Sequence, residues 1–298
     1  MVKMLCLFLV LQTTAFAAGI SVSVNEKKEV GAFSVGVGSA VTLKSDDEKL
    51  NGAATFLGKV IHSDGSESYQ MYLDKKGKKV YYIDASDFAR KNSKLQTVID
   101  PYEQAGGTCT AYAIYGFLQQ THLSGFEGTG ELATTLASED TRTHLLADAI
   151  NEYYLTPAHR YSIRGILDKY GKKFGFKCKK FQTDTYESAK AHVMKQLDQG
   201  SPVIVSFNIG PKMVQSPFKL EMYGHTKPEI DGRLWIPRKV GERNSGGHTI
   251  LAAASFTHNE RLYFVMVDSD WSEPRIWDAE ETLNNKTAVS EIEFVTCK

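Results

Sequence analysis

The sequence predicts an α+β protein in which a small β-rich module precedes a larger domain of helices followed by strands. Short runs of β-branched and aromatic residues, separated by turn signals, fill residues 30–90. Apolar residues take helical spacing after residue 100, and strand-like runs return after residue 200. With 298 residues, 42% of them hydrophobic, the chain is long enough for one large or two modest cores.

The first 17 residues are typical of a secretory signal peptide. Lys3 supplies a positive start, and the apolar run over residues 4–10 is too short to span a bilayer. Ala15-Phe16-Ala17 then gives the small-x-small pattern that a signal peptidase requires. We therefore expect cleavage after Ala17 and a secreted or periplasmic protein. No later stretch approaches about 20 apolar residues, so no membrane span is expected.

Residues 18–90 are expected to form a small β-barrel domain. Four runs have strand character: residues 41–43, 54–61, 69–73 and 80–83. Turn signals lie at Asp64-Gly65 and at residues 75–77. The stretch resembles the SH3-like modules of bacterial exported proteins, and this resemblance makes a cell-wall or surface ligand its candidate partner. The polar residues 91–99 are expected to be a linker.

The domain predicted for residues 100–298 begins with helical patterns. Four segments have the spacing of helices: residues 110–120, 140–154, 161–170 and 186–199. The first is apolar on nearly every side, which is typical of a helix buried within a domain. In the last, Ala189, Val193 and Leu197 form one stripe, and Gly200 is a stop signal.

The rest of this domain is predicted to be rich in sheet. Strands are expected at residues 202–209, 249–255, 262–268 and 290–296. Residues 257–261 would form a hairpin turn between the second and third of these strands. Residues 210–247 contain glycine, proline and polar residues, and loops of that length are usually functional or mobile.

Charge and motif content exclude several classes of function. Lys and Arg number 35, as do Asp and Glu, so nothing favours nucleic acid as a partner. The chain contains no Cys-x-x-Cys, no His-Glu-x-x-His and no phosphate-binding glycine-rich loop. We therefore expect neither a metal nor an organic cofactor.

Three cysteines follow the predicted leader: Cys109, Cys178 and Cys297. An odd number in an exported protein leaves one thiol unpaired, and three pairings are open. Only a Cys178–Cys297 bridge would leave Cys109 free. The alternative is that all three are reduced and act as small buried hydrophobic residues.

Cys109 stands in the most informative stretch, Gln104-Ala-Gly-Gly-Thr-Cys109. Two glycines allow the backbone to turn tightly just before the predicted helix, which places Cys109 near the helix N-terminus. The helix dipole and unpaired N–H groups lower the pKa of a thiol there. Gln104 and the Cys109 backbone N–H could together form an oxyanion hole. The plainer alternative is a structural buried cysteine.

His248 is the strongest candidate for the base that such a thiol needs. It follows Gly246-Gly247 and opens an apolar strand, whereas most of the other histidines lie in plain helical or turn settings. The predicted hairpin would bring Asp268 or Asp270 to the imidazole as its orienting acceptor, and both remain open. Trp271 could shield that hydrogen bond from solvent.

The order of these residues resembles the papain-like cysteine peptidases from about Asp100 to the C-terminus. The matching features are Cys109-Thr-Ala-Tyr-Ala, Gly247-His248 and the acid that precedes Trp271. The resemblance implies a two-lobed papain-like fold, with a helical lobe and an antiparallel β lobe. It also implies hydrolysis of peptide bonds in protein or peptide substrates through a thioester acyl-enzyme.

Three features depart from the family pattern. Gln104 lies five residues before the cysteine rather than six, with Glu103 at the sixth position. Aspartate replaces the usual asparagine, and the β-rich module takes the place of the helical propeptide. Alternatives to a general endopeptidase are a cell-wall peptidase of NlpC type and a catalytically inactive binding protein.

Overall fold

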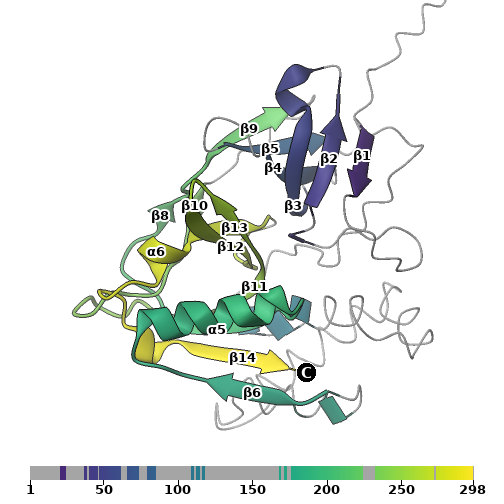
Figure 1. Cartoon of the computed structure of the whole chain (residues 1–298). Coiled ribbons are helices and arrows are strands. Elements are labelled where there is room, and N and C mark those ends of the chain that lie inside the picture. The colour runs from purple at the N-terminus through teal and green to yellow at the C-terminus, as the bar shows by residue number, and fades with distance from the viewer. Residues whose placement is uncertain are drawn as a thin grey trace, which may run out of the picture.

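The computed structural model describes residues 21–24, 37–38, 40–45, 47–61, 66–73, 79–84, 109–110, 112–114, 116–117, 168, 171–172, 176–223, 232–271 and 273–297. These residues form two six-stranded sheets and one two-stranded ribbon (Figure 1). The strand orders of the two large sheets are β1-β2-β3-β4-β5-β9 and β13-β12-β11-β7-β14-β6. Among the described residues, no helix has the length and apolar character needed to cross a membrane.

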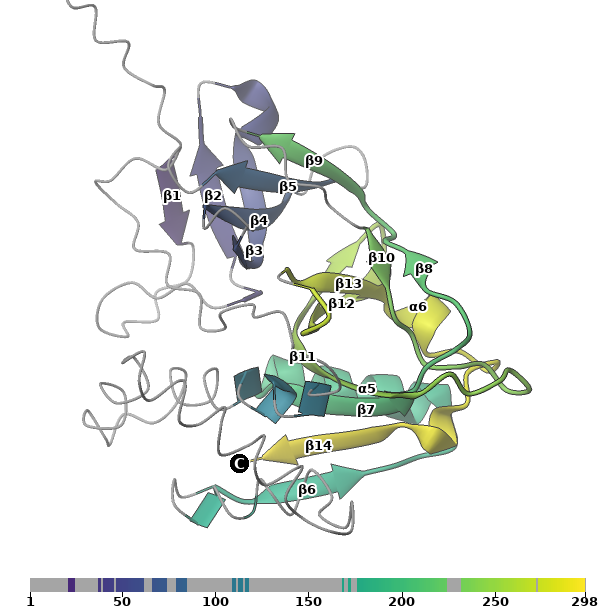
Figure 2. The ribbon, with the colours of Figure 1, turned by 180° about the vertical axis from the view of Figure 1, so that it is seen from behind.

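The N-terminal sheet contains the four strands predicted for residues 41–83. Its members are β1 (Ser21–Val24), β2 (Ala40–Lys44), β3 (Gly52–Ile61), β4 (Glu67–Leu73), β5 (Lys79–Asp84) and β9 (Lys219–Tyr223), with a 3-10 turn at Glu48–Leu50. Neighbouring strands are antiparallel, except that β9 pairs with β5 in parallel. Figure 2 shows β9 at the sheet edge, far in sequence from its neighbour. The predicted loop 210–247 therefore contributes a strand to the N-terminal sheet.

The second sheet is antiparallel throughout and carries the longest strand of the described chain. Its members are β6 (Cys178–Phe181), β7 (Val203–Asn208), β11 (Gly247–His258), β12 (Arg261–Val267), β13 (Arg275–Asp278) and β14 (Glu293–Cys297). The smaller elements are β8 (Val214–Gln215), β10 (Arg233–Leu234), α6 (Ala279–Thr282) and a 3-10 turn at Val289–Glu291. Strands β7, β11, β12 and β14 confirm the four strands predicted in this half of the chain.

A tight turn joins β11 to β12, as the sequence predicts. Asn259 and Glu260 both have positive φ, at 48° and 64°, and His258 pairs directly with Arg261. Two central residues with positive φ match the right-handed twist of the flanking strands. In this register Val267, the last residue of β12, pairs with Leu251, so the start of β11 extends past the end of β12.

Helix α5 (Tyr186–Asp198) confirms the helix predicted for residues 186–199. Ala189 and Val193 are buried, and they join one hydrophobic cluster with residues of β7, β11, β12 and β14. The helix ends where Gly200 takes φ +74°, a conformation that favours glycine. The amphipathic stripe is therefore the reason that α5 covers one face of the second sheet (Figure 1).

A β-bulge lets β11 supply side chains to two different cores. Ile250 and Ala252 belong to the cluster beneath α5, whereas Ala254 and Phe256 belong to a second cluster. All four are even-numbered, so a regular strand would place them on one face. The register shifts between Ala252 and Ala254, and the one extra residue, Ala253, reverses the faces.

The second cluster joins the two large sheets. The N-terminal sheet contributes Leu57, Val60, Tyr72, Val80 and Tyr82, and the other residues are Phe218, Ala254, Phe256, Tyr263, Val265 and Ile276. Tyr72 stacks on Phe256 at 4.6 Å between ring centroids, and its hydroxyl bonds to Nδ1 of His258. The N-terminal sheet is thus packed into the protein through a shared core.

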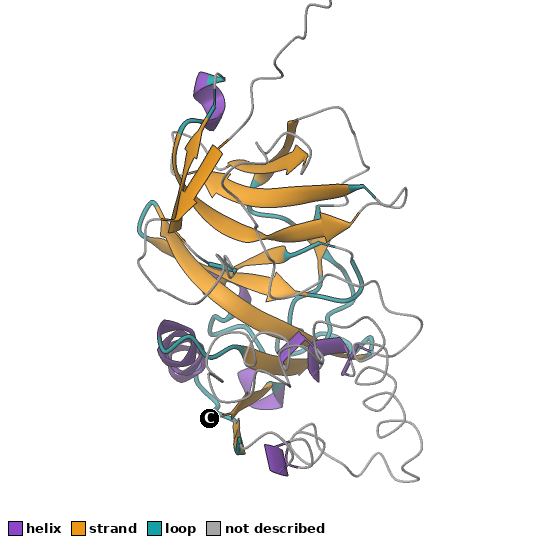
Figure 3. Cartoon of the chain, turned by 90° about the vertical axis from the view of Figure 1, so that its right-hand side faces the viewer, coloured by secondary structure: helices purple, strands orange, loops and turns teal. Residues whose placement is uncertain are grey.

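The predicted fold class, a two-lobed papain-like α+β fold preceded by a small β-barrel, is wrong. The protein is mostly antiparallel sheet, and strands dominate Figure 3. The N-terminal sheet is open in its described residues, because β1 and β9 are its edges. Local periodicity predicted helix α5 and most of the strands, but it did not predict the strands within residues 210–247 or the packing of the second sheet against another sheet.

Two of the predicted helices fall largely outside the described residues. The helix predicted for residues 140–154 lies entirely outside them. Of the helix predicted for residues 161–170, only residue 168 is described, and it is helical. In the predicted helix over residues 110–120, residues 110, 112–114, 116 and 117 are helical. Ala113, Ile114 and Phe117 are buried there, as expected for a helix inside a domain.

Candidate active site

Cys109 and His248, 139 residues apart in the sequence, meet in the structure. Cys109 is helical and half-buried, and His248 is the second residue of β11 and only 5% exposed. The thiol and the imidazole are close enough for each to shift the pKa of the other. Thr110, which follows Cys109, also contacts Thr249, which follows His248, because their hydroxyl oxygens lie 3.1 Å apart. Two consecutive helical residues therefore contact two consecutive strand residues.

Asp268 is the acid that bonds to His248. Its Oδ1 accepts a hydrogen bond from His248 Nε2 at 2.8 Å, and its side chain is 1% exposed. Oδ1 also accepts the backbone N–H of Asp270 at 3.0 Å, which fixes the carboxylate within its own turn. The register of the β11–β12 hairpin explains the meeting: Leu251 pairs with Val267, the last residue of β12, so His248 and the other residues at the start of β11 lie beside the turn that follows β12.

The electrostatics of this array favour a charged pair. Burial opposes protonation of His248, but its hydrogen bonds to Asp268 and Cys109 and the charges of both outweigh burial and raise its pKa from 6.5 to about 10. Burial likewise opposes the Cys109 thiolate, yet the hydrogen bond and charge of His248 lower the pKa of the thiol. The imidazolium and the thiolate stabilise each other.

Two further groups near Cys109 favour its thiolate. The backbone N–H of Thr249 and the hydroxyl of Thr110 both lower the pKa of the thiol. The Thr249 hydroxyl in turn donates to Ser206 Oγ on β7 at 3.1 Å. Sequence reasoning missed these residues. The available signal was that a threonine directly follows both the predicted nucleophile and the predicted base.

Asp270, the other candidate acid, is adjacent but not hydrogen-bonded to the imidazole. Its Oδ2 lies 3.9 Å from His248 Nε2 and accepts the indole N–H of Trp235 at 2.7 Å. Trp235 belongs to the predicted loop 210–247, so local sequence signals did not identify it. The choice between the two acids thus follows from distance, with Asp268 as the direct partner.

The aromatic ring that contacts His248 comes from β7 in the described part of the chain. Phe207 lies edge-on to the imidazole, with centroids 5.9 Å apart. The predicted shield, Trp271, lies with its ring 4.1 Å from Cζ of Arg275, in a cation–π contact. Gln104 and Glu103 lie outside the described residues, so the oxyanion role of Gln104 stays a prediction.

His248, Asp268 and Asp270 also form the one cluster of three potential metal-ligating side chains among the described residues. One ligand atom from each lies within 4.8 Å of the others. Each side chain already has a hydrogen-bonding or charged partner within the protein. We therefore treat the cluster as a hydrogen-bonded array.

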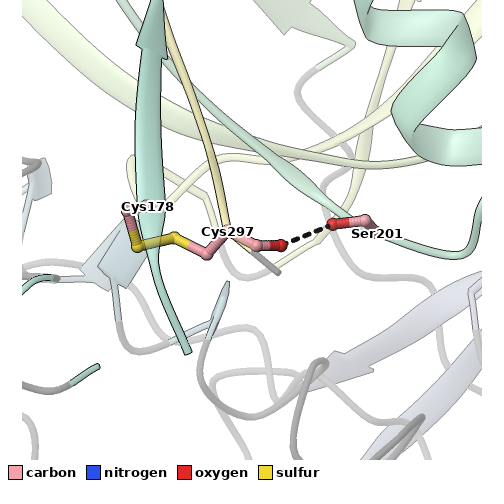
Figure 4. The surroundings of a disulfide bond; sticks show 3 residues. All are labelled: Cys178, Ser201 and Cys297. Carbon is pink, nitrogen blue, oxygen red and sulfur yellow. Dashed lines mark hydrogen bonds between the residues drawn. A yellow bond between two sulfur atoms is a disulfide. The ribbon is translucent and has the colours of Figure 1, made fainter. Parts of the chain in front are cut away.

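The other two cysteines of the described chain form a disulfide at one edge of the second sheet. Cys178 of β6 and Cys297 of β14 are directly paired across the strands, with Cα atoms 4.0 Å apart (Figure 4). The Ser201 hydroxyl donates to the Cys297 carbonyl at 3.2 Å. This selects one of the three pairings open from the sequence. Among the described residues, the free thiol is that of Cys109.

A separate cavity of about 330 Å³ lies beside β8, β10 and α6. Its lining includes Leu234, Ile236 and Asp278, but neither Cys109 nor His248. Leu234 and Ile236 flank Trp235, whose indole reaches Asp270. The cavity is therefore not the site described above.

No known protein family and no curated protein matches this chain. A functional proposal consequently depends on the residues and geometry of the site itself.

Proposed function

We propose that this protein is a cysteine-type peptidase in which Cys109 is the nucleophile, His248 the general base and acid, and Asp268 the orienting residue. The observation that carries the proposal is the array Cys109–His248–Asp268, in which a half-buried thiol has a lowered pKa and a buried imidazole a raised one. A lowered thiol pKa beside a histidine is the usual means of activating such a nucleophile.

The two ring nitrogens have different roles. Nε2 donates to Asp268, which leaves Nδ1 to share its proton with the sulfur. The Asp268 carboxylate fixes the orientation of the ring and stabilises the imidazolium. Because the Asp268 side chain is 1% exposed, water competes little for this bond.

The reaction would proceed by acyl transfer. The thiolate adds to a peptide carbonyl, and the backbone N–H of Cys109 and the amide of Gln104 are the expected donors to the oxyanion. The imidazolium gives its proton to the leaving amine as the C–N bond breaks, and a thioester remains. His248 then takes a proton from water, the hydroxide attacks the thioester, and the thiolate is released with the acid product.

The proposal includes export of the chain. Its support is the Cys178–Cys297 disulfide, since such bonds persist in oxidising compartments. Residues 1–17 supply the predicted leader. Substrates would be proteins or peptides, and the N-terminal sheet remains a candidate surface for a cell-wall ligand. Casein zymography beside peptidoglycan digestion separates a general peptidase from a cell-wall peptidase.

Alkylation of Cys109 at pH 6 tests the proposed function. Iodoacetamide should label one thiol per chain faster than it labels free cysteine, because a thiolate is the reactive form. His248→Ala should abolish this advantage, and Asp268→Asn should reduce it. His192→Ala serves as the matched control, since His192 packs on Phe181 of β6.

Two results would count against the proposal. Labelling of the wild-type protein no faster than free cysteine would indicate a binding protein without catalysis. Equal labelling of His248→Ala and His192→Ala would show that the imidazole does not activate the sulfur.

A further inference from the structure

Two carboxylates, not one, lie against the imidazole of His248. Asp268 makes the short hydrogen bond, while Asp270 Oδ2 is 3.9 Å from the same nitrogen. Their environments differ, because the Asp268 side chain is 1% exposed and that of Asp270 is 28% exposed. At 3.9 Å a carboxylate acts on the ring through its charge rather than through a hydrogen bond.

Each carboxylate has its own N–H donor. Asp268 Oδ1 accepts the backbone N–H of Asp270, and Asp270 Oδ2 accepts the indole N–H of Trp235 at 2.7 Å. These donors offset the repulsion between two acids that face one imidazole. They also keep the acids in separate places, because Oδ2 of Asp270 is directed to the indole rather than to the position of Asp268.

Trp235 is itself held in place by the aromatic layer under the site. Its carbonyl accepts the indole N–H of Trp277 at 3.0 Å. Trp277 meets Phe207 edge-on at 5.3 Å, and Phe207 meets His248 edge-on at 5.9 Å. The contacts therefore run from Asp270 through three aromatic residues, Trp235, Trp277 and Phe207, back to the imidazole.

We propose that Asp270 is a second positioning residue of this site, and that Trp235 holds its carboxylate where the charge stabilises the His248 imidazolium. The consequence for catalysis rests on the proposed function. The claim that the charge of Asp270 stabilises the imidazolium is independent of the proposed function, because it concerns only the titration of His248. Asp268 sets the orientation of the ring, and Asp270 extends the range of pH over which the ring keeps its proton.

The charged groups that face His248 in the described part of the chain are Cys109, Asp268 and Asp270. Neutralising only Asp270 leaves the short hydrogen bond to Asp268 in place. The ring should then lose its proton at lower pH, by about half a unit to one unit, because a charge about 4 Å away contributes about 1 kcal/mol where water screens it fully.

The test is the titration of the His248 ring, followed by nuclear magnetic resonance in protein labelled with ¹⁵N-histidine and assigned with His248→Ala. Asp270→Asn should lower the midpoint by about half a unit to one unit. Trp235→Phe should lower it in the same direction. The double variant should fall no further than Asp270→Asn alone, because both changes remove one interaction. Trp271→Phe is the matched tryptophan control, and its midpoint should equal that of the wild type.

The outcomes separate this inference from the proposed function. A wild-type midpoint near the ordinary 6.5 would overturn the charged pair, and the proposed function with it. A wild-type midpoint near 10 that Asp270→Asn leaves unchanged would overturn only the role of Asp270. A Trp235→Phe protein that is folded by circular dichroism and titrates like Trp271→Phe would overturn the role of Trp235. If Trp235→Phe does not fold, Asp270→Asn decides alone, since its side chain is partly exposed.

Discussion

The side-chain amide of Gln70 in β4 donates a hydrogen bond to the carbonyl of Pro274, 204 residues further along the chain. Gln70 is 1% exposed, and its amide also donates to the Tyr82 hydroxyl at 2.7 Å. Pro274 lies between β13 and the turn that carries Asp268 and Asp270. The N-terminal sheet therefore supports the segment that presents both acids to His248.

A small-to-large change at Gly58 tests this support. A Cβ atom there would lie 2.5 Å from Cγ of Pro274, and φ is +146°. Gly58→Ala should destabilise the protein by about 1–3 kcal/mol more than Gly200→Ala, because overpacking adds to backbone strain. Gly200 is the matched control, with φ +74° and open space around it. Urea denaturation measures both, and equal losses would mean that Pro274 moves aside freely.

Cys109 should react as a thiolate over a wide range of pH. Its pKa is lowered and that of His248 is raised to about 10, so the charged pair exists between these two values. The rate of alkylation should rise as pH increases through the lowered pKa of the thiol and stay high at neutral pH. Stopped-flow alkylation from pH 4 to 9 measures this profile. A single rise near the ordinary thiol pKa would contradict it.

Thr110→Val should slow alkylation of Cys109 at pH 6 by roughly threefold to tenfold. The change keeps the shape of the side chain but removes a hydroxyl that lowers the pKa of the thiol, a loss of about 1 kcal/mol. Thr249→Val is the matched control, because the backbone N–H of Thr249 still reaches the sulfur. If both variants react alike, the Thr110 hydroxyl does not stabilise the thiolate.

The two large sheets should remain associated when the chain is cut between them. A protease site engineered into residues 91–99 would leave the parallel pairing of β5 with β9 and the shared hydrophobic cluster intact. The cut protein should elute from a sizing column as one species in native buffer and as two in denaturant. Two folded species in native buffer would show that the shared core is too weak to hold them.

Loss of the disulfide should affect stability more than it affects the site. The bridge closes a loop of 119 residues, so Cys178→Ala with Cys297→Ala should cost about 4–5 kcal/mol on the chain-entropy account. Cys109→Ser, a thiol change outside the bridge, should cost less than about 1 kcal/mol. Urea denaturation compares the variants. A cost near zero for the double variant would mean that the unfolded chain without the bridge is as conformationally restricted as the unfolded chain with it.

The sequence alone predicted most of the local elements and the candidate reactive pair, Cys109 and His248. Strands β2 to β5, helix α5 and the β11–β12 hairpin follow from apolar spacing and turn residues, which record how each segment is buried. A pair of glycines, which have no side chain, lies shortly before Cys109 and another before His248, and these pairs marked the two side chains as candidates. The odd number of cysteines predicted one free thiol.

Only the tertiary structure decided which segments meet. The parallel pairing of β9 with β5 and the packing of the N-terminal sheet on the second sheet leave no periodic signal in either segment. The choice of Asp268 over Asp270 depended on about 1 Å in the distance to one ring nitrogen. Trp235 reaches the site from a segment without regular pattern. Such contacts depend on the fit between completed surfaces, whereas sequence patterns describe each segment by itself.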